Sequence, residues 1–319
     1  MTEKVSVVIV NYNGKDLLNP LIKSILSSDY KNYEIILVDN NSGDGSADFI
    51  KKNYKNIKLV LNKKNLGYSG INSALSYCKG DYILFLNNDM EIDKKCIGEL
   101  VKTLKSDKNA EMAAPKLVNY YDKKLQSGGT WASRAFYNGH IQGSGREETK
   151  EIPYMGVGLI RMDFVNMFGY LFDPDYFIYA EDLDLGMRIR LSGKKVIFEP
   201  KAVMRHMHAV TMQKAKKSFS AFLMERNLLT TFLKILSAGN VILYLPYVLS
   251  LRLVAMLKDI LTLRFDLAFA RIRAIFAVLL NFGNIIRKRK ETQKFRKADD
   301  SYIFQIFTEK YLFRKKFIV

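Results

Sequence analysis

One apolar run that passes directly into amides and a carboxylate constrains the fold of this chain more than any other feature. Residues 82–86 read Tyr-Ile-Leu-Phe-Leu, and Asn87, Asn88 and Asp89 follow at once. An unbroken apolar run is typical of a strand buried on both faces of a mostly parallel sheet. Because ligands of open α/β sheets bind beyond the carboxyl ends of the strands, we expect a ligand near these three side chains. Their oxygens suit Mg²⁺ or Mn²⁺ carrying substrate phosphates, although a polar turn with Asp as a helix cap fits the same residues.

The order of strand, polar loop and helix repeats through the first hundred residues. Strands are expected at residues 5–10, 34–38, 58–61 and 82–86, and helices at 16–28, 47–53, after 70 to 77, and at 93–106. This alternation predicts a doubly wound, mostly parallel sheet. Residues 110–160 are rich in turn residues and show no clear period, and a helix at 182–191 and a strand at 195–198 follow them.

Positive charge is concentrated in the last third of the chain. Residues 212–319 contribute +14 of the net +18, from 21 Lys and Arg against 7 Asp and Glu. The pattern from about 218 to 282 is helical and strongly apolar, and Glu225-Arg226-Asn227 at its start are interpreted as helix surface. We therefore expect an α/β domain over residues 1–211 and a basic amphipathic helical region over 212–319. Such a region indicates an anionic membrane surface or a nucleic acid as partner.

Three arrangements fit these C-terminal helices. Residues 235–251 fall short of the ~20 apolar residues that a membrane span needs, and they contain Pro246. Amphipathic helices lying in the membrane interface are favoured, because basic residues recur throughout. A soluble helical subdomain ranks second and a span last. A nucleic-acid-binding arm would interleave aromatic residues with Lys and Arg, whereas the aromatics here occur in apolar runs, so we expect no nucleic acid partner.

Cysteine content and the N-terminus bear on the compartment. Cys78 and Cys96 are too few for a disulfide framework, which fits a reducing environment. The first four residues are polar and lead straight into a strand, so no signal peptide is expected. With the basic helices, these features predict a cytoplasmic protein, peripheral on the inner face of the membrane.

Three acids open the helix expected at 182–191. Glu181 and Asp184 share a helix face, and Asp184 and Arg188 have the spacing of an ion pair. Asp182 then points elsewhere and is a candidate general base, because partial burial beside aromatic residues raises the pKa of a carboxyl group. Acids that merely complement the helix dipole are the alternative.

Two of the three histidines, His206 and His208, lie two residues apart after the expected strands. Such a pair is more often structural than ligating. With a carboxylate cluster elsewhere, one of them becomes a candidate metal ligand.

Taken together, these pieces resemble the inverting family 2 glycosyltransferases with the GT-A fold, in particular the rhamnosyltransferase-like group. The resemblance rests on an ordered set of segments: residues 5–14, 36–46, 65–72, 85–89, 156–163, 168–170, 181–188, 193, 206–211 and 226–227. It implies a GT-A (Rossmann-like) fold and transfer of one sugar, with L-rhamnose as a candidate, from a nucleotide-diphosphate donor to a lipid-linked or surface-polysaccharide glycan.

The resemblance also implies roles for single residues. Tyr12 would stack on the nucleobase, Asp39 would contact base or ribose, and Asn65 and Gly67 would lie near the diphosphate-sugar. The other implied donor contacts are Val10, Asn11, Asn41 and Asn88. Asp89 would bind Mg²⁺ or Mn²⁺ with help from His206 or His208, and Asp182 would be the base, with Glu181 beside it. On the acceptor side, the implied stretches are 127–131, which contains Trp131, and 137–145, and Gly156 is a further implied residue.

The chain departs from the family pattern at several positions, Ala209 and Thr211 after the histidines among them. Asn87 replaces the first acid of the metal motif, and Glu91 is a possible substitute. A Q-x-x-R-W motif is absent, which favours single transfers over polymerisation. A sugar nucleotidyltransferase is the alternative enzyme, but it would want a glycine-rich basic loop after the first strand, which residues 11–14 do not provide.

Overall fold

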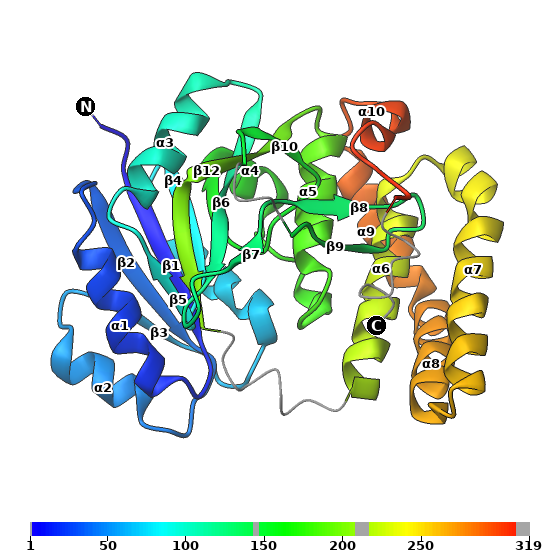
Figure 1. The fold of residues 1–319 in the computed structure, drawn as a ribbon, viewed down its shortest axis with the longest axis horizontal. Helices are drawn as coiled ribbons and strands as arrows, with labels where there is room; N and C mark the ends of the chain where they lie inside the picture. Colours follow the sequence, from blue (N-terminus) through cyan, green and yellow to red (C-terminus); the bar gives the residue numbers. More distant parts are fainter. Residues whose placement is uncertain (1, 143–146, 208–216, 311–319) are drawn as a thin grey trace.

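The computed structural model describes residues 2–142, 147–207 and 217–310 of the chain (Figure 1). The strands are β1 Val5–Asn11, β2 Tyr33–Asp39, β3 Lys58–Leu61, β4 Tyr82–Asn87, β5 Met90–Ile92, β6 Ala110–Asn119, β7 Leu125–Ser127, β8 Thr130–Ala132, β9 Asn138–His140, β10 Lys150–Ile152, β11 Gly158–Arg161 and β12 Lys195–His206. The α-helices are α1 Lys15–Leu26, α2 Ser46–Asn53, α3 Cys96–Ser106, α4 Met162–Phe168, α5 Glu181–Leu191, α6 Lys217–Ile235, α7 Ala238–Leu261, α8 Phe265–Leu280, α9 Phe282–Gln293 and α10 Asp300–Phe304. Two 3₁₀ segments, η1 Gly67–Tyr77 and η2 Pro174–Tyr176, complete the described elements.

The central sheet has the strand order β10-β12-β6-β11-β4-β1-β2-β3, with β5 paired to β12 and β7 to β6. Strands β3, β2, β1 and β4 are parallel neighbours, as are β6 and β12, whereas β11 runs antiparallel between β4 and β6. Val10 is paired with Asn87, and Asn11 with Asp39, so the polar ends of three strands lie side by side. The predicted mostly parallel sheet followed by an all-helical region is confirmed.

The structure adds strands that the sequence pattern did not reveal. β6 and β11 lie in the turn-rich region, where Pro115 and several alanines obscure the strand period. β12 extends well beyond the expected 195–198, because its pairing with β6 shifts register between Glu199 and Val203 and then resumes. This extension carries His206 to the end of the sheet beside β5.

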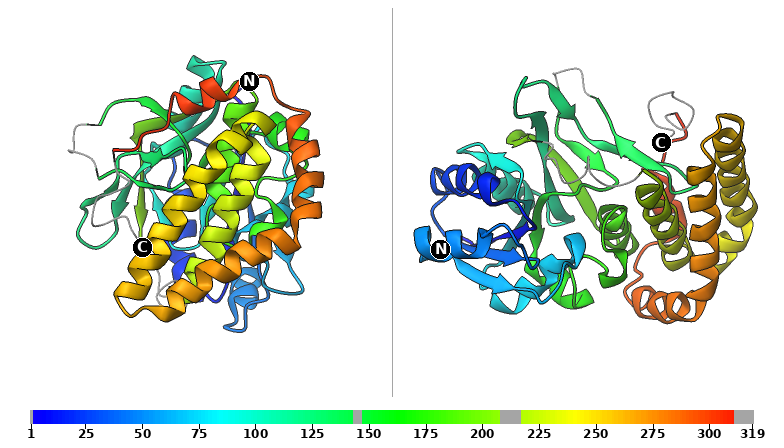
Figure 2. Two further views of the ribbon diagram at one scale, coloured as in Figure 1. Left: turned by 90° about the vertical axis from the view of Figure 1, so that its right-hand side faces the viewer. Right: turned by 90° about the horizontal axis from the view of Figure 1, so that it is seen from below.

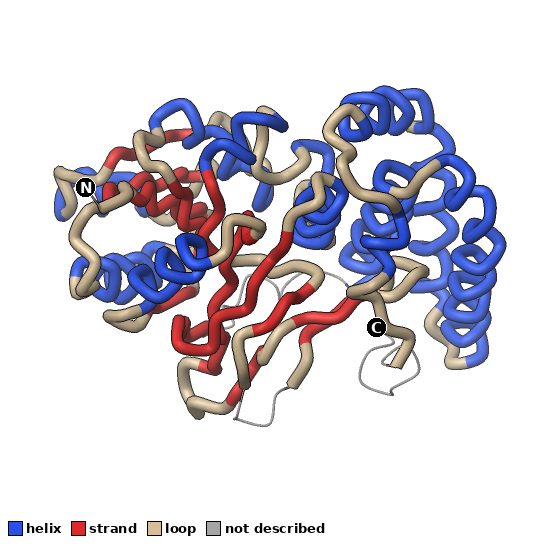
Figure 3. The backbone as a smooth tube through the Cα atoms, turned by 90° about the horizontal axis from the view of Figure 1, so that it is seen from above, coloured by secondary structure: helices blue, strands red, loops and turns tan. Residues whose placement is uncertain are grey.

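The C-terminal helices pack against the α/β part and share a core with it. Figures 2 and 3 show them gathered on one side of the molecule, away from the edge formed by β3. The second apolar cluster joins Leu183 and Met187 of α5 and Phe136 to Leu228 and Phe232 of α6. Side chains from both sides of residue 211 therefore fold together, and the division at 211/212 stays a prediction.

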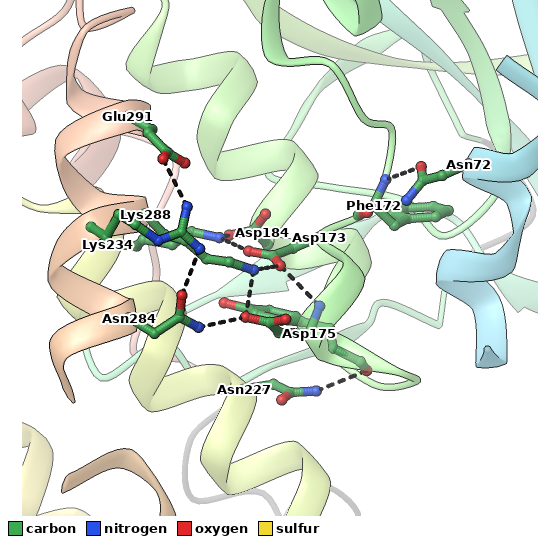
Figure 4. Close-up of polar contacts among 12 residues, drawn as sticks. Asn72, Phe172, Asp173, Asp175, Asp184, Asn227, Lys234, Asn284, Lys288 and Glu291 are labelled. Carbon is green, nitrogen blue, oxygen red and sulfur yellow. Dashed lines mark hydrogen bonds and ion pairs between the residues drawn. The ribbon is translucent and has the colours of Figure 1, made fainter. Parts of the chain in front are cut away.

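Buried ion pairs hold α5 and α6 together (Figure 4). Lys234 of α6 lies 2.6 Å from Asp173 and 2.7 Å from Asp184 of α5, and all three side chains are fully buried. Arg188 pairs with Asp184 at 2.9 Å, as its spacing predicts, and Lys288 of α9 also reaches Asp173. Burial by itself raises the pKa of Asp173, but Lys234 and Lys288 outweigh it and hold that pKa well below its ordinary value.

One described helix, α7, is long and apolar enough to cross a membrane. Helices α8 and α9 pass the same test only as a pair, and they bend by 68° at their junction. Length and composition alone thus permit a span but do not require one.

Replacing Lys234 by Met tests the buried ion pairs. The substitution leaves Asp173 and Asp184 without their shared buried cation, which costs about 3 kcal/mol of unfolding free energy, since a buried charge that loses its partner is strongly destabilising. Lys290→Met, at an exposed position of α9, is the control and changes stability by less than about 0.5 kcal/mol. Chemical denaturation measures both, and equal effects would contradict the role given to Lys234.

Candidate functional site

A pocket of about 600 Å³ lies at the polar ends of β1 and β4. The sheet supplies one part of its lining, including Asn11, Asn88 and Asp89. The start of α5, with the loop before it, supplies another part, including Glu181 and Asp182. Residues from the polar segments that follow β1, β2 and β4, and from the segment that opens α5, therefore meet around one cavity.

A chain of side-chain hydrogen bonds organises the sheet side of the pocket. Asn88 Nδ2 donates to Asn11 Oδ1 at 2.7 Å, and Asn11 Nδ2 donates to Asp39 Oδ2 at 2.9 Å. Ser42 N donates to the other oxygen of Asp39 at 2.8 Å, so this carboxylate fixes the loop after β2. Gly14 is required beside them, because a Cβ there would lie 2.0 Å from Asn88 Nδ2. Asp39 is buried behind the pocket surface and orients Asn11, which does line it.

Gly67 brings η1 against the loop before α5. Its φ is +64°, and a Cβ would lie 1.9 Å from the carbonyl oxygen of Phe177. Tyr68 N donates to that oxygen at 2.7 Å, and Tyr68 OH donates to Gly156 O at 2.8 Å. Asn65 caps the turn by accepting from Gly67 N at 2.8 Å. These contacts leave Asn65, Gly67, Tyr68 and Gly156 in the pocket lining.

Asp89 and His206 form the candidate metal site. His206 Nε2 lies 3.1 Å from Asp89 Oδ2, while its Nδ1 lies 2.9 Å from the Gln126 side chain, which fixes the ring. Two ligands of one Mg²⁺ or Mn²⁺, each ~2.1 Å from the ion, would have a similar separation. The described residues hold no group of three or more potential His, Cys, Asp or Glu ligands. The pair therefore fits a cation that takes its remaining ligands from substrate phosphates and water.

Glu91 does not join this pair. β5 alternates its side chains, and Glu91 instead pairs with Arg205 at 3.4 Å, outside the residues that line the pocket. Its suggested role as a substitute ligand is contradicted by this orientation. His208, the other candidate ligand, lies outside the described residues.

The two acids at the start of α5 have raised pKa values. Burial, and next the charge of Asp182, raise the pKa of Glu181 well above its ordinary value. Burial also raises the pKa of Asp182 to about 6. The carboxylate of Asp184 does not line the pocket and instead forms ion pairs with Arg188 and Lys234. A carboxyl group with a pKa near 6 that faces a pocket suits a general base near neutral pH.

The loop that presents these acids has an unusual backbone. Phe177, Tyr179 and Ala180 all have positive φ, at 36°, 71° and 60°. Asn227 of α6 secures it, because its Nδ2 donates to the carbonyl oxygens of Tyr179 at 2.7 Å and Ile178 at 3.1 Å. Strained backbone of this kind persists only where its surroundings impose it, and it is common at functional sites.

The interpretation of residues 225–227 as helix surface is therefore wrong. Asn227 and Glu225 are buried, and each serves as a polar anchor. The signal available in the sequence was an Asn within an apolar helix. The role of Asn227 could be assigned only once the loop carbonyl groups that it binds were known.

The remaining predicted residues take different places. Val10 and Tyr12 line the pocket, whereas Asn41 is exposed and Trp131 is buried at 2% exposure, and neither is among the lining residues. Asn138 and His140 also line it, within the stretch 137–145 that the resemblance implies for the acceptor side. Four residues that sequence reasoning did not assign to the site line it too: Asn40, Tyr68, Gln126 and Tyr154. Gln126 and Tyr154 come from the turn-rich region, where no periodic pattern marked them.

Known glycosyltransferases resemble this chain in sequence. Residues 6–163 match the family model described as "Glycosyl transferase family 2". The chain is 42% identical over 90 residues to the "UDP-Glc:alpha-D-GlcNAc-diphosphoundecaprenol beta-1,3-glucosyltransferase WfaP" of Escherichia coli, covering 27% of this chain and 36% of that protein. It is 36% identical over 101 residues to the "Poly(ribitol-phosphate) beta-glucosyltransferase" of Bacillus spizizenii, covering 30% of this chain and 16% of that protein. The chain thus spans about a third or less of the length of these two relatives.

A solved structure shares the fold. The structure described as "GalNAc-T7 with UDP, GalNAc and Mn2+" superposes with a TM-score of 0.59 and 19% identity, over 72% of this chain and 47% of that one. At this identity the likeness concerns the fold alone.

Substituting Gly67 tests the packing of η1 against the loop before α5. Gly67→Ala combines a positive φ with a Cβ clash against backbone, so we expect a loss of more than about 2 kcal/mol of unfolding free energy. Gly98→Ala is the control, because a Cβ there meets nothing within 4 Å and the position is inside α3. That control should gain about 0.5–1 kcal/mol. Denaturation curves that rank the two variants in the opposite order would contradict the packing.

Proposed function

Residues 6–163 belong to glycosyl transferase family 2, and from this premise we propose that the chain transfers one sugar from a nucleotide-diphosphate donor to an acceptor hydroxyl with inversion. One observation carries the proposal. A carboxylate with a raised pKa, Asp182, and the Asp89–His206 pair line the same pocket but come from different elements. This arrangement separates a base for the acceptor from a site for the donor's diphosphate.

The chemistry follows from that separation. Asp182 accepts the proton of the acceptor hydroxyl as that oxygen attacks the anomeric carbon, and the nucleoside diphosphate leaves from the opposite side. A single displacement of this kind inverts the configuration. A divalent cation held by Asp89 and His206 would neutralise charge that develops on the leaving diphosphate. Asn88 and Asn11 orient polar contacts for the donor, and Tyr12 offers an aromatic ring at the rim.

Donor and acceptor are proposed by class. The names of the relatives mention UDP-glucose, an undecaprenol-diphosphate glycan and poly(ribitol-phosphate). We propose a lipid-linked or surface-polysaccharide glycan as the acceptor, and L-rhamnose remains a candidate sugar from the resemblance of the motifs. Thermal stabilisation by a panel that includes UDP-sugars and dTDP-rhamnose, with Mn²⁺, identifies the donor. Release of pyrophosphate in place of nucleoside diphosphate would favour a sugar nucleotidyltransferase.

Asp182→Asn tests the base. The variant keeps nucleotide-sugar binding but loses ~10²-fold or more in turnover, because the amide accepts no proton at neutral pH. In the wild type, kcat/KM should rise with pH below about 6 and level off above it, since the base must be ionised. Asp48→Asn, at an exposed position of α2, is the control. Full turnover in Asp182→Asn would remove Asp182 from the base role.

Asp89→Ala tests the cation site. We expect loss of the Mn²⁺-dependent part of donor binding, and EDTA should have the same effect on the wild type, since both remove the link between cation and phosphates. Glu91→Ala is the matched control, because Glu91 pairs with Arg205 outside the pocket. Calorimetry measures donor affinity. An affinity unchanged by both EDTA and Asp89→Ala would overturn the metal site.

A further inference from the structure

Helices α7 and α8 carry charged side chains on their inner side. Glu225 of α6 is buried between Arg252 of α7, at 3.1 Å, and Arg271 of α8. Arg271 Nε also donates to Asp259 of α7 at 2.8 Å. Helices that face water ordinarily bury apolar residues and expose charged ones. α7 and α8 instead bury Arg252, Asp259 and Arg271 and expose several large apolar side chains.

Their outward side carries a row of large apolar side chains. On α7, Leu253, Leu257 and Leu261 are spaced four residues apart and lie on one stripe. On α8, Phe265, Phe269 and Phe276 are four and seven residues apart and also lie on one stripe, and these six side chains are between 47% and 83% exposed. We call these six side chains the outer face. Figure 2 shows α7 and α8 lying across one side of the molecule, facing the viewer in its left panel.

The charges around the outer face favour an anionic partner. In residues 238–280, all of which the structure describes, the exposed cations are Lys258, Arg264 and Arg273, against one exposed acid, Asp266. A second copy of the chain placed on this face would bring like charges together, which disfavours association. Anionic lipid head groups would neutralise them, at up to ~1 kcal/mol for each cation near the surface.

The geometry favours lying on a membrane over crossing it. α7 passes the length test for a span, but Arg252 and Asp259 tie one side of it to the body of the protein, and Arg252 also donates to Ala135 O at 3.3 Å. A crossing helix would have to break these buried contacts and place both charges in hydrocarbon. A one-sided apolar surface is instead what an interfacial helix presents.

We propose that the outer face docks on an anionic lipid surface, with α7 and α8 lying in the interface and Lys258, Arg264 and Arg273 among the head groups. The pocket is close to this surface. Phe219, in the first turns of α6, lines the pocket and is 49% exposed, and Arg273 of α8 stacks on Phe222 at 5.1 Å. In Figure 1 the start of α6 and the turn between α7 and α8 lie at the same end of the molecule.

Because Phe219 of α6 lines the pocket and α8 packs against α6, docking of the outer face holds the pocket near the lipid surface. An acceptor glycan attached to a lipid of the same membrane would then reach Asp182. This acceptor route rests on the proposed glycosyl transfer, whereas docking itself does not. Vesicle binding, measured without any sugar donor, can therefore fail or succeed independently of the enzymatic proposal.

Co-sedimentation of the full chain with vesicles tests docking. With vesicles of phosphatidylcholine and phosphatidylglycerol at 7:3, wild-type protein sediments, and Leu257→Glu/Phe269→Glu lowers the partition coefficient at least tenfold, because two apolar anchors are lost and two negative charges are added. Leu26→Glu/Leu61→Glu is the control, since it makes the same change at two equally exposed apolar side chains of α1 and β3. The control should bind as wild type does.

The outcomes separate the possible occupants. Equal binding by both double variants, or no binding by wild type, would overturn the proposal. Failure to bind vesicles, together with a wild-type dimer that Leu257→Glu/Phe269→Glu converts to a monomer, would assign the face to a second copy. A thermal midpoint equal to that of wild type without lipid shows that the double variant is folded.

An inserted fluorophore gives a second measurement that does not weaken binding. Trp131 is the single Trp of the chain and is buried, so a Trp placed at residue 269 reports locally. In vesicles with brominated phosphatidylcholine, Phe269→Trp should be quenched at least twofold more than Leu61→Trp. Equal quenching at both positions would contradict insertion of the outer face.

Discussion

The position of the candidate base depends on one buried ammonium group. Lys234 neutralises Asp173 and Asp184 where neither is reached by water, and Asp184 belongs to the same first turn as Asp182. Uncompensated carboxylates at that depth would separate α5 from α6. Asn227, two turns earlier on α6, holds the strained backbone that leads into Asp182. The C-terminal helices thus act as the support of the site.

The pocket combines two carboxylates that their environments make different. Asp182 is buried without a cation among the causes of its pKa shift, so that pKa rises to about 6. Asp89 instead faces an imidazole whose other nitrogen is held by Gln126, an arrangement that suits a ligand for a hard cation. In the proposed reaction, one carboxyl group accepts a proton and the other binds a metal. The fold keeps these tasks apart by taking one from the sheet and the other from α5.

The proposed lipid surface would join these features into one assembly. Glu225 draws Arg252 and Arg271 inward, which leaves the apolar sides of α7 and α8 facing outward. The same helix, α6, carries Glu225, Asn227 and Lys234, and begins with Phe219 at the pocket. Successive turns of one helix therefore link the outer face, the loop before the base and the buried ion pairs.

The sequence by itself determined the first four strands of the sheet, the polar segments at their ends and the helical character of the last third. Those features depend on local periodicity, which unbroken apolar runs such as residues 82–86 express directly. It also indicated Asp182 and Asp89 as candidates, because each follows a recognisable strand or opens a helix, and both line the pocket. Only the tertiary structure decided that Glu91 pairs with Arg205, that Asn227 is an anchor, and that Gln126 and Tyr68 belong to the pocket. These outcomes depend on contacts between residues far apart in the chain. The inward-facing charges of α7 and α8 also depend on such contacts. The sequence predicts amphipathic helices, but the buried partner Glu225 decides which side of each helix faces outward.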